Sequence, residues 1–164
     1  MDGNEIIGMT RILFVCHGNI CRSPMAESVF AAKVRGRRLE WAYTAVSAEE
    51  IGNPVHPGTQ RELARHGLPR SGHRAWQLGK ADYDRYDLFI GMDRENLRRM
   101  ERIFGGDPLH KIALLMAYTG EPREIEDPWY TDRYDVVYDE VEAGCEALLN
   151  ELEQERRVKG KHHE

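Results

Sequence analysis

The sequence predicts an α/β fold: a single three-layer domain in which a four-stranded parallel sheet carries helices on both faces. The first indication is that short β-rich apolar runs alternate with longer segments of helical periodicity, the pattern of right-handed β-α-β crossovers. The second is that 164 residues suffice for one core and contain no repeat or linker. We place the domain at residues 11–157, between an N-terminal extension (1–10) and a polar tail (158–164).

The strands are predicted from four short runs rich in apolar and β-branched residues. In chain order they are residues 11–15, 43–47, 87–91 and 112–116. The helices are predicted from apolar residues at three- and four-residue spacing, with glycine or proline near several of their ends. They cover residues 24–34, 57–66, 94–104 and 136–154, with a shorter helix near 80–83. Cys145 lies on the apolar stripe of the last helix, so we interpret it as a small core residue.

The first strand runs into a loop whose residues suit an anion. Residues 16–22 read Cys-His-Gly-Asn-Ile-Cys-Arg and are followed by Ser23 and Pro24. Serine is a preferred N-cap and proline suits the first helical position, so we expect a helix to begin at Ser23-Pro24. Loop amides and the positive end of the helix dipole would then converge on one point. Ligands of parallel sheets bind beyond the carboxyl ends of the strands, which is the same crevice.

Cys16 and Arg22 bracket this anion site. The field of a helix N-terminus lowers the pKa of a cysteine, so we expect Cys16 to be a thiolate at neutral pH. The guanidinium fork of Arg22 matches two phosphate oxygens and keeps its charge. A thiolate beneath a phosphate cradle indicates covalent phosphoryl transfer. The alternative, a structural cysteine near an unrelated arginine, does not explain why a strand, a Gly-Asn turn and a helix start surround the pair.

At these residues the chain resembles the low-molecular-weight protein tyrosine phosphatases, whose signature Val-Cys-x-Gly-Asn-x-Cys-Arg-Ser-Pro is matched at 15–24. Three further family segments follow in order, at 71–75 (Ser-Gly-His-Arg-Ala), 92–97 (Met-Asp-Arg-Glu-Asn-Leu) and 127–130 (Asp-Pro-Trp-Tyr). The resemblance spans roughly residues 11–150. It implies strand order 2-1-3-4 and hydrolysis of phosphotyrosine through a phosphocysteine intermediate, with no cofactor.

The resemblance also implies a role for each matching residue. Cys16 would be the nucleophile, Arg22 the phosphate-binding cation and Asp127 the general acid. The rest of the phosphate-binding loop would be His17, Gly18, Asn19, Ile20, Cys21 and Ser23. The residues expected to support that loop are Asn19, Ser23 and His73, with Ser23 also hydrogen-bonded to the thiolate. Trp129 and Tyr130 would line a slot for an aryl phosphate. Without the resemblance, Asp127-Pro128 would be only a turn signal.

The chain has three cysteines, an odd number that does not make a disulfide framework. Cys21 follows Cys16 by five residues, which is not the spacing of a zinc knuckle, and the histidines are scattered, so we predict no metal site. A reversible disulfide between Cys16 and Cys21 is a regulatory hypothesis, because a thiolate beside a resolving cysteine oxidises first.

The composition of the chain limits the kinds of molecule that it is expected to bind. The formal net charge of -5 disfavours nonspecific nucleic-acid binding, and no apolar run approaches the length of a membrane span. We predict a cytoplasmic enzyme, because the proposed thiolate requires a reducing compartment, and we expect it to be a monomer. Its partners would be phosphotyrosine-containing proteins, a tyrosine kinase among them, with no nucleic acid and no membrane.

Three other functions share this cradle. A phosphoarginine phosphatase of the same fold favours Thr where this chain has Ile20. An arsenate reductase needs further redox cysteines, but none lies between Cys21 and Cys145. An inactive phosphotyrosine-binding module would lack the nucleophile or the acid, and this chain has both. The chain departs from the family at residues 48–57, where two acidic residues, Ile51 and His56-Pro57 replace a Gly-rich aromatic stretch followed by Asp-Pro, so we expect a less aromatic and more negative wall.

Overall fold

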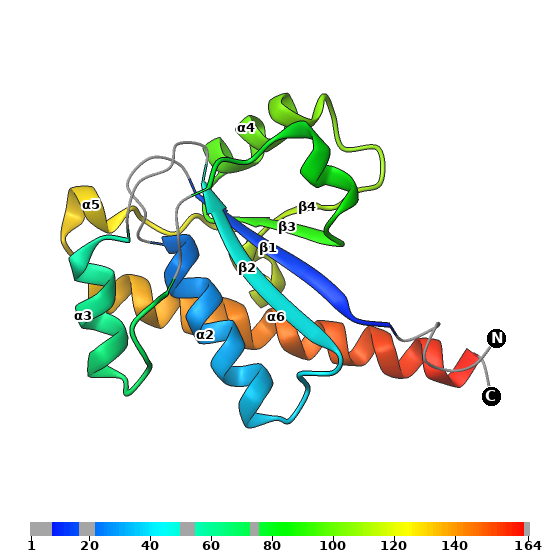
Figure 1. The fold of residues 1–164 in the computed structure, drawn as a ribbon, viewed down its shortest axis with the longest axis horizontal. Helices are drawn as coiled ribbons and strands as arrows, with labels where there is room; N and C mark the ends of the chain where they lie inside the picture. Colours follow the sequence, from blue (N-terminus) through cyan, green and yellow to red (C-terminus); the bar gives the residue numbers. More distant parts are fainter. Residues whose placement is uncertain (1–7, 17–21, 50–54, 73–75, 163–164) are drawn as a thin grey trace.

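The computed structural model describes residues 8–16, 22–49, 55–72 and 76–162. Strands and helices alternate along the chain, and two 3₁₀ helices (η1 and η2) lie among them (Figure 1). In order, the elements are β1 (Thr10–Cys16), α2 (Arg22–Gly36), β2 (Tyr43–Glu49), α3 (Pro57–Arg65), η1 (Lys80–Asp84), β3 (Leu88–Gly91), α4 (Arg94–Phe104), β4 (Ile112–Leu114), η2 (Leu115–Thr119), α5 (Pro128–Thr131) and α6 (Tyr134–His162).

The four strands form one parallel sheet in the order β2-β1-β3-β4, which confirms the predicted fold class and strand order. β1 is an inner strand and pairs with both β2 and β3. Val15 is in register with Gly91, so Cys16 and the segment after β3 leave the sheet side by side. The carboxyl end of β1 is thus the point from which the first loop and the start of α4 diverge.

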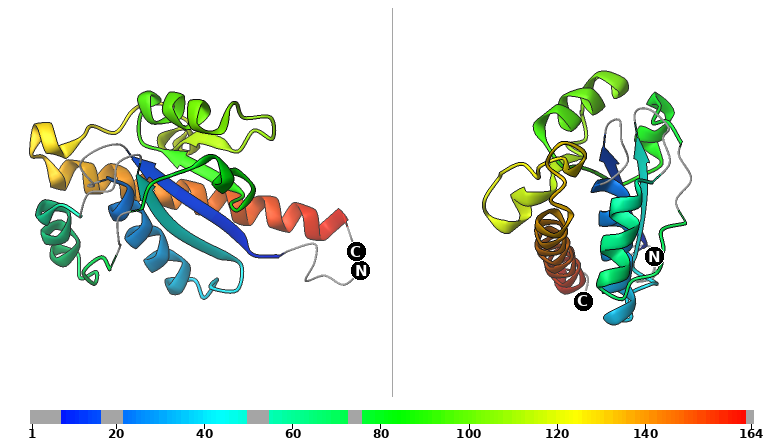
Figure 2. Two further views of the ribbon diagram at one scale, coloured as in Figure 1. Left: turned by 45° about the horizontal axis from the view of Figure 1, so that its top comes forward. Right: turned by 90° about the vertical axis from the view of Figure 1, so that its left-hand side faces the viewer.

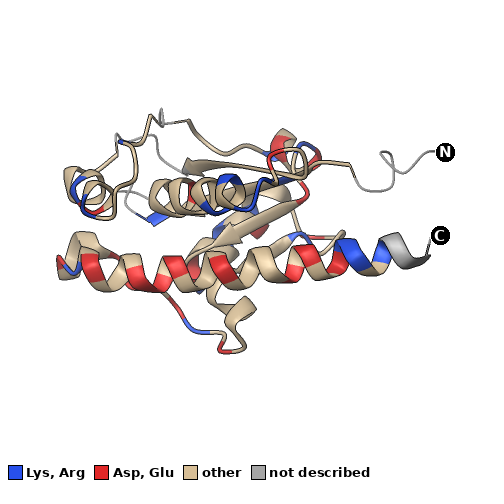
Figure 3. Ribbon diagram, turned by 90° about the horizontal axis from the view of Figure 1, so that it is seen from below, with Lys and Arg blue, Asp and Glu red and all other residues tan. Residues whose placement is uncertain are grey.

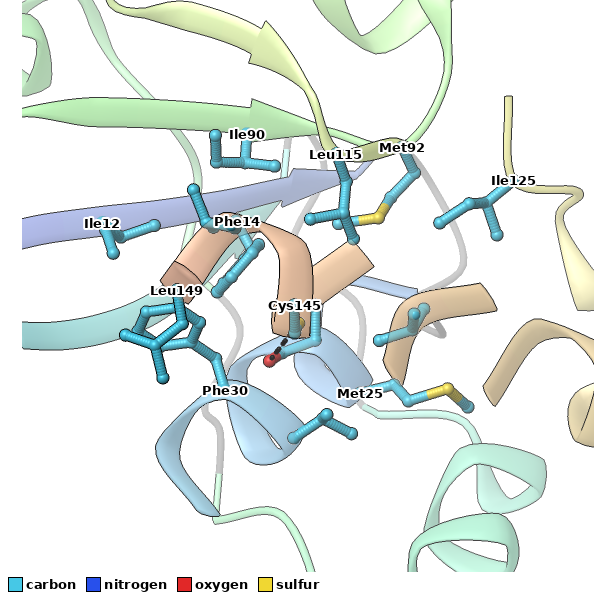
Figure 4. Packing of buried hydrophobic residues seen from close by; sticks show 14 of the residues in the cluster. Ile12, Phe14, Met25, Phe30, Ile90, Met92, Leu115, Ile125, Cys145 and Leu149 are labelled. Carbon is cyan, nitrogen blue, oxygen red and sulfur yellow. Dashed lines mark hydrogen bonds between the residues drawn. The ribbon is translucent and has the colours of Figure 1, made fainter. Parts of the chain in front are cut away.

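Helices cover both faces of the sheet, so β1 is buried on both sides (Figure 2). Ile12 and Phe14 belong to the core that the sheet forms with α2 and α6, and Figure 4 shows them packed with residues of those helices. Leu13 and Val15 belong to the opposite core, with Phe89 and residues of α4. This burial explains why the first strand reads as a continuous apolar run rather than as an alternating one.

α2 and α6 lie beside each other on the same face (Figure 3). Their apolar sides meet in the core, and their rims carry ion pairs. Lys33 of α2 donates to Glu142 at 2.9 Å and to Glu146 at 3.0 Å. Partly exposed pairs of this kind contribute about 0–1 kcal/mol each, so apolar packing is the main cause of this helix pairing.

Most observed boundaries lie within two residues of those predicted, and three differences have a structural consequence. α2 begins at Arg22, so Ser23 and Pro24 lie inside the first turn and the predicted N-cap role of Ser23 is wrong. β4 ends at Leu114, and the next residues form η2 instead of continuing the strand. The reason is packing: Leu115 lies so close to α6 that a Cβ on Gly144 would be 2.6 Å from its Cγ.

α6 runs well past the predicted end at residue 154 and into the segment assigned to a tail. Arg156 holds this extension against the start of the sheet, donating to the carbonyls of Gly8 at 2.8 Å and Ala42 at 3.1 Å. Its guanidinium also lies over the rings of Trp41 and Tyr43. Across the parts of the chain described here, no helix has both the length and the apolar character needed to cross a membrane.

Candidate active site

Cys16 is the last residue of β1 and lies against the start of α2. Its Sγ is 2.9 Å from the hydroxyl oxygen of Ser23, and both residues are buried. Because Ser23 belongs to the first turn of α2, the thiol lies at the positive end of a 15-residue helix. The local sequence suggested a helix cap for the Ser23 hydroxyl, and the family resemblance implied a bond to the thiolate; in the structure the hydroxyl lies against the sulfur. Such surroundings favour a thiolate over a thiol.

Arg22, the first residue of α2, is held by two fixed acceptors. Its Nη1 donates to Oδ2 of Asp93 at 2.8 Å and to the carbonyl of Ile125 at 2.7 Å. Only 4% of the side chain is exposed, so the charge depends on these partners. Both bonds use Nη1, and they orient the planar guanidinium. A guanidinium held in this way needs little reorganisation to bind a phosphate.

Asp93 is a site residue that we did not predict. Its Oδ1 accepts from the backbone N–H of Asn96 at 2.8 Å and caps α4, while its Oδ2 accepts from Arg22. The buried Asn96 completes the cap, because its Oδ1 accepts from the N–H groups of Met92 and Asp93. One carboxylate thus couples the start of α4 to the guanidinium. The available signal was the Met-Asp-x-x-Asn segment, which we used only as a mark of resemblance.

Asp127 lies on the other side of Arg22. Its Oδ2 is 3.9 Å from Nη2 of Arg22, and its Oδ1 accepts from the backbone N–H of Trp129 at 3.0 Å. Asp127 therefore caps α5, a short helix that the sequence prediction treated as a turn. The Asp-Pro pair was the signal, since Pro128 lies at a first-turn position that suits it.

An ion pair closes the segment that carries Asp127. The Nε of Arg133 donates to Glu126 Oε2 at 3.0 Å, joining the residue before Asp127 to the residue before α6. The Arg133 guanidinium lowers the pKa of the Glu126 carboxyl. The acid is thus carried on a short helix whose two ends are tied together.

The remaining predicted site residues are placed only in part. His17, Gly18, Asn19, Ile20, Cys21 and His73 lie outside the described residues, so their predicted roles stay predictions. Trp129 is 48% exposed and Tyr130 is 81% exposed. The rings of Trp129 and His56 meet edge to face, with centroids 5.3 Å apart. Within the described segments, no three His, Cys, Asp or Glu side chains gather as metal ligands would.

Comparison with known proteins identifies the family. The model of the family "Low molecular weight phosphotyrosine protein phosphatase" matches residues 11–158. Low molecular weight protein-tyrosine-phosphatase YfkJ of Bacillus subtilis is 37% identical over 156 residues, covering 92% of this chain and 100% of YfkJ. The low molecular weight phosphotyrosine protein phosphatase of Gallus gallus is 39% identical over 147 residues, covering 84% of this chain and 92% of the relative.

Solved structures agree with this result. The crystal structure of YfkJ superposes with a TM-score of 0.85 at 38% identity, covering 90% of this chain and 97% of that one. A Drosophila arginine phosphatase, DARP, superposes with a TM-score of 0.77 at 29% identity, covering 86% of this chain and 96% of that one. Because the family model matches most of this chain, the chain belongs to the low molecular weight phosphotyrosine protein phosphatase family. It is a cysteine-dependent phosphatase.

Proposed function

We propose that this chain hydrolyses phosphotyrosine in proteins and that Cys16 is its nucleophile. The proposal rests on one observation: the sulfur at the carboxyl end of β1 is 2.9 Å from the Ser23 hydroxyl, and the guanidinium of Arg22, the residue before Ser23, is 3.9 Å from the Asp127 carboxylate. A nucleophile, a phosphate-binding cation and an acid are the three parts that phosphoryl transfer from a phenol requires.

In the first step, the Cys16 thiolate attacks phosphorus, a P–S bond forms and the bond from phosphorus to the phenolic oxygen breaks. Asp127 gives its proton to that oxygen, so the product leaves as a phenol. In the second step, Asp127 takes a proton from water, the resulting oxygen nucleophile attacks phosphorus, and the P–S bond breaks to restore the thiolate. Arg22 stabilises the transferring oxygens in both steps, and Ser23 donates its O–H to the departing sulfur.

The substrate assignment has support from the family and from the acid's neighbours. Trp129 is half-exposed beside Asp127 and offers a ring face or edge to an aromatic leaving group. We assign phosphotyrosine-containing proteins as substrates, a tyrosine kinase among them, and a monomeric enzyme acting in the cytoplasm. Because one similar structure is that of a Drosophila protein named an arginine phosphatase, phosphoarginine is the alternative substrate to compare with phosphotyrosine.

The test is a comparison of phosphate release from phosphotyrosine, phosphoserine and phosphoarginine, each in a short peptide of the same sequence. We expect phosphotyrosine to have the highest kcat/KM. Rapid acid quenching and intact-mass measurement should detect a phosphorylated enzyme in the parent and none in Cys16→Ser. Faster hydrolysis of phosphoarginine would contradict the proposed substrate. A phosphorylated enzyme in Cys16→Ser would contradict the assignment of Cys16 as the nucleophile.

A further inference from the structure

His56 occupies the N-cap of α3, at the position where the sequence departs from the family. Its Nδ1 accepts from the backbone N–H of Gly58 at 3.0 Å. The hydroxyl of Tyr134, the first residue of α6, lies 2.8 Å from the same nitrogen. Because a backbone N–H can only donate, Nδ1 carries no proton in this arrangement and the tyrosine hydroxyl donates to it as well. The imidazole is therefore fixed in position by groups from two helices.

The rings around His56 make a packed cluster. Tyr134 stacks on the imidazole at a centroid distance of 5.5 Å and an interplanar angle of 16°. Tyr134 also lies against Gly58 so closely that a Cβ there would be 2.3 Å from the tyrosine ring. On another side, the edge-to-face contact of 5.3 Å joins the imidazole to Trp129 of α5. His56 thus touches residues on both sides of the short link between α5 and α6.

Trp129 connects this cluster to the acid. Its backbone N–H is the group that holds Oδ1 of Asp127, at 3.0 Å. A four-residue helix has little cooperativity of its own, so its placement depends on what its side chains contact. The contacts run from the N-cap of α3 through the Trp129 ring to its N–H and then to the Asp127 carboxylate.

We propose that His56 is a positioning residue for the general acid, acting through Trp129 to hold Asp127 beside Arg22. This inference rests on the proposed function, because it assigns the acid role to Asp127. His56 itself transfers no proton and need not contact substrate. Its loss should lower the rate of steps that need proton transfer, while the phosphate-binding contacts of Arg22 remain.

The chain contains a matched control. A second histidine–tyrosine pair, His66 and Tyr138, also joins the C-terminal end of α3 to α6, with ring centroids 3.6 Å apart and Nε2 of His66 2.9 Å from Glu62. The two pairs join the same two helices, but only the His56 pair includes Trp129 among the contacts described. A general loss of α3–α6 packing should therefore appear in variants of either histidine.

The experiment compares His56→Asn with His66→Asn. Asparagine caps helices well, so His56→Asn keeps an acceptor for Gly58 and removes the ring with its contacts to Trp129 and Tyr134. We expect kcat for phosphotyrosine to fall about tenfold, because misplacing a catalytic group by a fraction of an ångström costs this much or more. The burst of nitrophenolate from para-nitrophenyl phosphate, whose leaving group needs no proton, should keep its rate constant. His66→Asn should lower the melting temperature and leave kcat unchanged.

A double-mutant cycle tests whether His56 acts on Asp127 through Trp129. If His56 acts through Trp129, then His56→Asn combined with Trp129→Leu loses no more kcat than the worse single variant. Additive losses would overturn the inference, and so would an equal loss of kcat in His66→Asn. Tyr134→Phe removes one hydrogen bond from Nδ1 without removing a ring, and should give a smaller loss in the same direction. Unchanged kcat in both His56→Asn and Tyr134→Phe would also overturn it.

Asp127→Asn in the same assays separates this inference from the function on which it rests. If Asp127→Asn is slow on phosphotyrosine but keeps the burst of nitrophenolate, while His56→Asn is not slowed, only the role of His56 fails. If Asp127→Asn is slowed equally on both substrates and shows no burst of nitrophenolate, the acid role fails and the positioning role fails with it.

Discussion

Cys16 and Cys145 are both buried, with 1% and 0% of their surfaces exposed, yet their surroundings favour opposite forms of the sulfur. The difference originates in one helix. α2 presents its first turn to Cys16, where the Ser23 hydroxyl is 2.9 Å from Sγ. The same helix presents a backbone carbonyl to Cys145, whose Sγ is 3.7 Å from the oxygen of Ala26 (Figure 4).

A carbonyl oxygen can only accept, so it pairs with an S–H and repels a thiolate. Burial raises the pKa of the Cys145 thiol, which keeps it protonated. The N-terminal turn of α2 has the opposite effect on Cys16, since helix N-termini and hydroxyl donors stabilise an anion. Burial alone therefore does not predict the reactivity of a cysteine. The direction of the dipoles around it does.

The largest effect expected from the contrast between the two cysteines is that of replacing the Cys16 sulfur with oxygen. Cys16→Ser should reduce turnover of phosphotyrosine by about 10⁴-fold or more, because the nucleophile is lost while the phosphate-binding groups remain. Phosphate should still bind to the variant, as measured by calorimetry. Cys145→Ser is the paired control, and a comparable loss of turnover there would contradict the division of roles.

Asp127→Asn should have the next largest effect. A phenol with a pKa near 10 leaves poorly without a proton, and a positioned acid contributes about 10²–10⁴ in rate, so phosphotyrosine hydrolysis should fall within that range. With para-nitrophenyl phosphate, stopped-flow absorbance should show a burst of nitrophenolate before slow turnover, since the second step still needs a base. Equal losses on both substrates, with no burst, would point to another acid.

Arg22→Lys tests whether the thiol needs an oriented guanidinium or only a positive charge. The lysine can keep one bond to Asp93 but cannot bind two phosphate oxygens in a plane, so we expect kcat to fall about 10²–10³-fold. Steady-state kinetics and the inhibition constant of inorganic phosphate measure the two consequences separately. Activity near that of the parent would show that a point charge is sufficient.

Selective alkylation compares the two sulfurs directly. At neutral pH, iodoacetamide should modify Cys16 and abolish activity, while Cys145 should stay unmodified until the protein unfolds, because its raised pKa and burial both suppress the thiolate. Peptide mass spectrometry locates the label, and inorganic phosphate should protect Cys16. Labelling of Cys145 in the folded protein at the same rate would contradict the contrast.

Cys145→Ala should have the smallest effect. It removes a small buried group, which costs about 1 kcal/mol and lowers the melting temperature by about 2–4 °C. Activity should be unchanged. The Cys145 pKa is raised in the folded state, so its contribution to stability is full below the ordinary thiol pKa of about 8.5 and falls as the pH rises above it. As the pH rises from 8 to 10, the free energy of unfolding should therefore fall less in Cys145→Ala than in the parent, as measured by denaturant unfolding.

The sequence by itself determined the α/β class, the four strands and the segments that carry Cys16, Arg22 and Asp127. These depend on local signals: apolar runs, helical spacing, and motifs whose order along the chain resembles a known family. Even the strand order came from that resemblance, because periodicity says which residues are strands and not which strands are neighbours.

The tertiary structure decided what each local signal does. Ser23 reads as a helix cap from its neighbours, but its hydroxyl bonds to a sulfur seven residues earlier in the chain. Asp93 reads as the cap of α4, and its second oxygen fixes a guanidinium 71 residues away. His56 reads as a helix start, and its ring contacts Trp129 and Tyr134 far along the chain. Local sequence indicates which backbone groups a polar side chain could bond, and packing between distant elements decides which further groups come within its reach.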